Sequence, residues 1–201
     1  MKPLSNYLQE KLIIKKRKTL EYKYFPQTKE ELQNIINIRI EQEGNEVDLN
    51  DVDVSKITDM SELFEDTNFN GDISSWDVSN VTDMFEMFYG CKEFNSDISN
   101  WDVSNVKDMD GMFDKCKAFN QDISNWDVSN AIDMRFMFNG CEEFNSDISG
   151  WDVSKVTNMM SMFCNCKAFN QDLSKWNISN VKDNRHIFEK CPIEEKYKPK
   201  F

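Results

Sequence analysis

Apolar residues recur along this 201-residue chain with a period of 25, and five tryptophans mark that period most clearly. In the segment Ile98-x-x-Trp101-x-Val103, Asp102 stands between two apolar positions and is expected to face outward, because side chains alternate along a strand. A fixed period of this length is typical of stacked repeats, in which each unit buries its apolar side against its neighbours. The tryptophans are Trp76, Trp101, Trp126, Trp151 and Trp176.

A second apolar pattern follows each strand segment. Val106, Met109, Met112 and Phe113 recur at i, i+3, i+6 and i+7, which predicts one face of a short helix. Strand and helix patterns alternate six times, including a divergent first unit with valine in place of tryptophan. We therefore expect an α/β repeat solenoid, a leucine-rich-repeat-like stack of short parallel strands and short helices with an N-terminal helical cap.

The two ends of the chain depart from the repeat. Thr28 and Glu31 form a capping box at the start of an apolar periodic segment, and Gly44 supplies a stop signal, which together predict a helix. This helix is expected to cover the open end of the stack. The predicted organisation is a basic arm (1–25), a capping helix (26–46), a six-coil solenoid (47–191) and a C-terminal tail (192–201).

The charge is unevenly distributed. The chain carries a net −12, yet residues 1–24 hold seven lysines and arginines against two glutamates, so the remainder carries −17. An acidic body repels nucleic acid and favours a basic protein partner, although acidity can also serve solubility alone. The sequence has neither the apolar run of a membrane span nor a secretory signal, which predicts a cytoplasmic protein.

One outward-facing column is the candidate binding site. Successive coils place a carboxylate at the same phase, and like charges about 5 Å apart repel by roughly 0.8 kcal/mol at the dielectric constant of water. A column of this kind is either a strip that binds a basic partner or a structural feature in which each carboxylate accepts hydrogen bonds from nearby serines. Its members are Asp53, Asp77, Asp102, Asp127, Asp152 and Asn177.

Other repeated residues favour structural roles. A second column, Asp72, Asp97, Asp122, Asp147 and Asp172, is typical of side chains that bond turn amides, with calcium as the alternative. Five cysteines repeat at intervals of 25 residues from Cys91 to Cys191, with Cys164 as an extra one, which favours buried reduced thiols over disulfides or a metal site. The single histidine, His186, and the absence of a glycine-rich phosphate loop favour a protein without catalytic residues, cofactor or metal.

The units FNSDISNWDVSNVKDMDGMF and FNQDISNWDVSNAIDMRFMF closely resemble the BspA-like leucine-rich-repeat family of bacterial surface proteins. The resemblance covers about residues 47–191. It implies a leucine-rich-repeat solenoid with a binding rather than a catalytic role, and it keeps a surface-associated or phage-related location open beside the cytoplasmic one.

The leading hypothesis is a non-enzymatic solenoid that binds a basic protein through an acidic concave face. Two alternatives remain: a structural or assembly module whose contacts are made by the N-terminal region, and an acidic mimic of nucleic acid.

Overall fold

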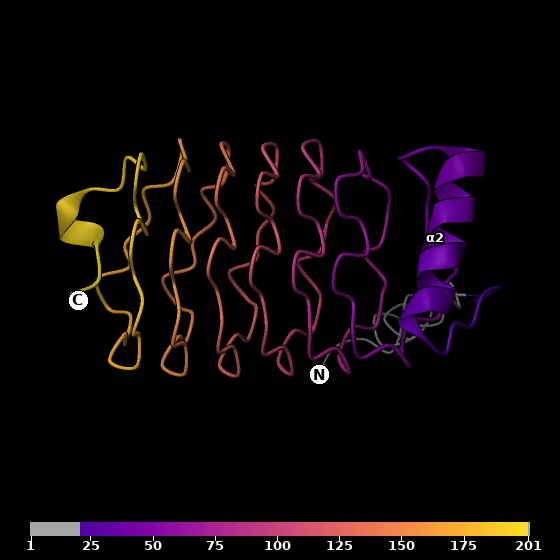
Figure 1. The fold of residues 1–201 in the computed structure, drawn as a ribbon, viewed down its shortest axis with the longest axis horizontal. Helices are drawn as coiled ribbons and strands as arrows, with labels where there is room; N and C mark the ends of the chain where they lie inside the picture. The colour runs from indigo at the N-terminus through magenta and orange to yellow at the C-terminus, as the bar shows by residue number, and fades with distance from the viewer. Residues whose placement is uncertain (1–20, 201) are drawn as a thin grey trace, which may run out of the picture.

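A computed structural model describes residues 21–200, and the basic arm expected over residues 1–25 lies almost wholly outside that range. The described chain forms a row of coils between helix α2 (Lys29–Glu43) at one end and the short 3-10 helix η1 (Glu195–Tyr197) at the other (Figure 1). We number the coils in chain order as coil 1 (47–69), coil 2 (70–94), coil 3 (95–119), coil 4 (120–144), coil 5 (145–169) and coil 6 (170–191).

The prediction of an α/β repeat solenoid is wrong. Over residues 21–200 the structure has no strand and no helix inside the coils. It has only isolated parallel bridges, one between Tyr24 and Val52 and five between successive coils. The leucine-rich-repeat assignment fails with it, because that architecture requires a sheet of stacked strands. The five bridges between coils follow one column of residues: Asp59, Asp83, Asp108, Asp133, Asn158 and Asp183.

The predicted helices are replaced by a ladder between coils. In each coil, the third residue after the bridge residue adopts left-handed backbone geometry, with φ of 48° at Glu86 and 54° at Phe136. This geometry interrupts a right-handed helix. Every second amide then donates to the next coil instead of to its own segment. In coil 2, four amides bond carbonyls of coil 3 at 2.8–3.0 Å, from Met84 to Asp108, Glu86 to Asp110, Phe88 to Met112 and Gly90 to Asp114.

The predicted strands are successions of turns. The Trp101 amide donates to Ile98 O at 3.2 Å, and the Oδ1 atoms of Asp97 and Asp102 accept the amides two residues further on. These Asx turns fold the backbone back on itself and use the groups that a strand would offer to its neighbour. The Trp101 indole nitrogen makes the link between coils, donating to Ile73 O of the preceding coil at 3.2 Å.

The core is a set of stacked side-chain columns. Trp101 and Val103 are 4% and 1% exposed while Asp102 between them is exposed, so the in–out alternation read from the sequence holds without a strand. Phenylalanine rings stack along the coils, as in the Phe88–Phe113 pair with centroids 5.6 Å apart and planes at 2°. Offset aromatic pairs of this kind contribute about 0.5–1.5 kcal/mol beyond the burial of their area.

Helix α2 covers the coil 1 end of the row (Figure 1). Its N-cap Thr28 accepts the Glu31 amide at 3.2 Å, and it ends at Gly44, whose φ is 89°. Leu32 and Ile36 are fully buried in the same core cluster as the coils. The apolar side of coil 1, which has no preceding coil, is therefore shielded from water by this helix.

Candidate functional site

The outer column, defined as Asp53, Asp77, Asp102, Asp127, Asp152 and Asn177, lies on the surface. Its Oδ1 atoms accept the backbone amides of the serines two residues on, at 3.0–3.2 Å. All its members except the half-buried Asp53 are exposed. The hydrogen bonds proposed as the structural alternative are therefore present in each coil, and the Oδ2 atoms receive no hydrogen bond from the described residues.

A second set of carboxylates lies five residues earlier in the same turns. In this turn column, Oδ1 again accepts a serine amide, at 2.9–3.0 Å, and every member is exposed. Within residues 21–200, no carboxylate of either column lies within ion-pair distance of a lysine or arginine. The turn column consists of Asp72, Asp97, Asp122, Asp147 and Asp172.

Hydrogen bonding favours the ionised form of three carboxylates in these columns. Bonds from Ser129 and Ser154 lower the pKa of Asp127 and Asp152, and the same interaction lowers the pKa of Asp122. A hydrogen bond to the charged form of an acid favours that form. The charged form of these three carboxylates is therefore favoured, although the neighbouring Asp152 acts in the opposite direction on the pKa of Asp127.

Two acidic residues that lie beside the hydrogen-bond ladder between coils were not identified from the sequence. Asp110 and Asp114 are only 6% and 8% exposed, and burial raises the pKa of each to about 6. Arg135 Nε lies 2.9 Å from Asp110 Oδ2 without pointing its hydrogen at that atom, so the ion pair does not overcome the loss of solvation. Asp114 Oδ1 accepts Asn139 Nδ2 at 2.9 Å. The sequence signal that could have identified them is that the residue type at these two positions varies from coil to coil, unlike the residue types of the core positions.

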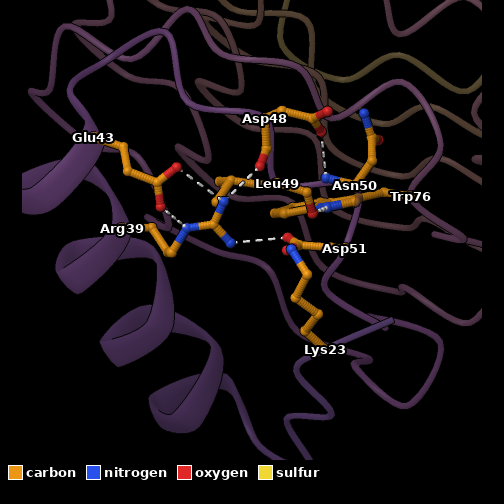
Figure 2. Close-up of polar contacts among 8 residues, drawn as sticks. All are labelled: Lys23, Arg39, Glu43, Asp48, Leu49, Asn50, Asp51 and Trp76. Atoms are coloured by element: carbon orange, nitrogen blue, oxygen red, sulfur yellow. Dashed lines mark hydrogen bonds and ion pairs between the residues drawn. The ribbon is translucent and has the colours of Figure 1, made fainter. Parts of the chain in front are cut away.

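A buried arginine joins α2 to coil 1 (Figure 2). Arg39 is 7% exposed and donates to Glu43, to Asp51 Oδ1 at 2.8 Å and to Asp48 O at 2.9 Å. Lys23 also reaches Asp51, at 2.9 Å. Burial alone would raise the pKa of Asp51, but these two cations hold it below its usual value. The cluster is satisfied internally and fixes the helix to the stack.

The cysteines form a buried column. The thiols of Cys91, Cys116, Cys141 and Cys166 donate to the phenylalanine carbonyl of the preceding coil at 2.9–3.0 Å. Burial raises the pKa of all four, to about 11 for Cys91, so the thiolate needed for metal binding is disfavoured. No cluster of three or more potential metal ligands occurs within residues 21–200.

These features define a class: a capped row of repeated coils that displays two columns of carboxylates, none of which pairs with a lysine or arginine of residues 21–200. A family model described as "Mycoplasma protein of unknown function, DUF285" matches residues 31–135 and 99–198, most of the chain, and the chain belongs to this family. The match supports a repeat family, a broader statement than the BspA-like resemblance. No curated protein and no solved structure matches the chain.

The helices of the described residues were also compared with the requirements for a membrane-spanning segment. No helix formed by residues 21–200 combines the length and the apolar character that crossing a membrane requires.

Proposed function

We propose that this protein is a non-enzymatic interaction module that binds a basic protein partner through the outer and turn columns. The observation that carries the proposal is the set of ten carboxylates in these columns, nine of them exposed and none paired with a cation of the described residues. The resemblance of the repeat to BspA-like surface proteins also favours binding over catalysis. The expected concavity of the face depended on a sheet of strands and is not part of the proposal.

Asn177 separates the structural role of these positions from their charge. Its Oδ1 accepts the Ser179 amide at 3.2 Å, the same contact that Asp152 makes with Ser154 at 3.0 Å. A neutral amide therefore supports the turn, which leaves the negative charge of the aspartates without a structural purpose in the described residues. Repeated at neighbouring coils, that charge raises the free energy of the isolated protein and is relieved when a cationic surface binds.

The test removes charge while keeping the turns. A variant with four outer-column aspartates changed to asparagine is compared with one that loses four exposed glutamates elsewhere, so both have the same net charge. The first set is Asp77, Asp102, Asp127 and Asp152; the control set is Glu41, Glu65, Glu93 and Glu143.

Both variants and the wild type are used in pull-downs from host lysate and in titrations with a labelled oligolysine peptide at several salt concentrations. We expect the outer-column variant alone to lose the partner and to bind the peptide with a shallower salt dependence. Equal binding by all three proteins refutes the proposal. Capture that requires residues 1–24 would instead favour an assembly module, and competition by DNA for the captured protein would favour a nucleic-acid mimic.

A further inference from the structure

The ladder of hydrogen bonds between coils ends at coil 6, where four backbone amides have no carbonyl acceptor among residues 21–200. In coil 5, the amides of Met159, Ser161, Phe163 and Asn165 donate to coil 6 carbonyls at 2.8–2.9 Å. The equivalent amides of coil 6 have no acceptor among residues 21–200. We name this set the C-terminal edge: the backbone amides of Asn184, His186, Phe188 and Lys190.

The C-terminal edge offers donors without acceptors. Each carbonyl from residue 183 to residue 189 already accepts a backbone hydrogen bond. Those of Asp183, Arg185, Ile187 and Glu189 bond coil 5, and the three between them close turns within coil 6. An ordinary strand edge alternates donors and acceptors, so a segment that matches this edge must present carbonyls at every second residue and no amides.

Apolar side chains beside the edge also lack the cover they have in the inner coils. Val153 and Val156 of coil 5 are 1% and 0% exposed, whereas their equivalents Ile178 and Val181 are only half-buried. With Trp176, they line an open cavity of about 520 Å³ at the end of the row. Helix η1 and the residues after it cover another part of the same end face. The Leu173 amide donates to Tyr197 O at 2.8 Å, Lys198 lies over the Phe188 ring, and Lys200 lines the cavity.

We propose that the C-terminal edge docks a repeat coil of the same type supplied by another protein. The segment that begins at the bridge aspartate presents its carbonyls toward the preceding coil and its amides away from it. The five interfaces between coils in this structure show that such a segment fits a donor edge. The four amides of the edge are distinct from the carboxylates of the two columns, although Asn177 of the outer column also lines the cavity, and the inference does not rest on the proposed partner of those columns.

A second folded copy of this chain does not satisfy the edge. Two C-terminal edges would oppose donors to donors. The acceptor side of coil 1 is covered by α2, where Gln33 Nε2 donates to Leu63 O at 3.0 Å and Lys29 contacts Ser61. The occupant is therefore a coil whose carbonyl side has no capping helix.

The probe is a fluorescent ten-residue peptide with the sequence of residues 131–140, which spans the carbonyl-bearing segment of coil 4; a peptide of the same composition in scrambled order is the control. The protein variant is Asn184→Pro, which removes one donor of the edge. Its matched control, Asn184→Ala, keeps the amide.

We expect saturable binding of the native-order peptide to the wild type and to N184A, and binding weaker by about tenfold or more to N184P. Amide hydrogen exchange tests the same contact without a substitution. The amides of residues 186, 188 and 190 should exchange quickly in the free protein and slow down when the peptide is added, while those of residues 161, 163 and 165 stay protected throughout. Equal binding of the scrambled peptide, no binding, or unchanged exchange at these three amides overturns the proposal.

Discussion

Replacing Asp114 with asparagine is expected to stabilise the protein at pH 8 and to have little effect near pH 4. Burial raises the pKa of Asp114 to about 6, from an ordinary value of 3.8. Because the folded-state pKa is the higher one, the folded protein holds more protons than the unfolded chain between about pH 4 and 6, and its stability falls as pH rises through that window. Above pH 6 the protein bears the full free-energy cost of burying the ionised Asp114 carboxylate.

The magnitude follows from the size of the shift. About two pKa units at roughly 1.4 kcal/mol each give a penalty of up to about 3 kcal/mol at pH 8. Asparagine removes the charge and keeps an oxygen that can accept the 2.9 Å bond from Asn139. Its new amide group needs a partner, and an imperfect one costs about 1 kcal/mol. The expected net gain is therefore about 1–2 kcal/mol at pH 8.

Urea unfolding followed by tryptophan fluorescence at pH 8 and pH 4 measures the free energy of unfolding directly. The matched control is Asp97→Asn, an exposed position where asparagine can keep the turn, as Asn177 does in the outer column. We expect the control to stay within about 0.5 kcal/mol of the wild type at both pH values. A D114N variant with no gain at pH 8, or with the same gain at both, would refute the reasoning.

Three further outcomes are expected. Trp126→Phe removes the indole donor that bonds Ile98 O at 3.2 Å in the core, and should lower the free energy of unfolding by about 1–3 kcal/mol in urea titrations. Arg39→Ala leaves Asp51 without its buried partner and should cost about 2–4 kcal/mol, seen as a lower urea midpoint; an unchanged midpoint would exclude a stabilising role for this cluster. In the native protein, a thiol reagent followed by mass spectrometry should modify the partly exposed Cys164 before any cysteine of the buried column, and all of them should react equally in urea.

The period, the buried columns and α2 could be predicted because each depends on residue type at a fixed spacing. Tryptophan, valine, methionine and phenylalanine recur every 25 residues and occupy the core, and Thr28 with Gly44 marks a helix by its local capping chemistry. These signals depend only on residue type and spacing, so the predictions drawn from them hold although the predicted fold class is wrong.

The backbone path inside the coils could not be predicted in the same way. An apolar spacing of three residues, as from Met109 to Met112, suits a helix and equally a tight turn that closes after three residues. The choice was made by hydrogen bonding between coils, which a single unit does not reveal. Glu86 and Phe136 stand at left-handed positions although neither residue type favours that geometry. Glycine holds the equivalent position only in coil 3, at Gly111, and the second left-handed position at Gly90 and Gly140, so the local signal for the turn was intermittent.

Asp110, Asp114 and Arg39 were missed because their burial depends on the neighbouring coil or helix. Each is a charged residue that sequence patterns place on the surface, and each is less than 9% exposed. The serine contacts of the outer column, in contrast, connect residues two apart, and the sequence could name them as a possibility before the structure was known.

The way in which successive coils meet has a consequence for how such proteins can change in length. Coils 2–5 contact their neighbours through the same ladder, the same tryptophan bond and the same stacked rings, and only the two terminal coils meet specialised caps. Deleting or duplicating 25 residues in the middle of the chain would join surfaces that already fit. The display of carboxylates can thus lengthen or shorten in whole steps, by unequal recombination between near-identical units, without redesign of either end.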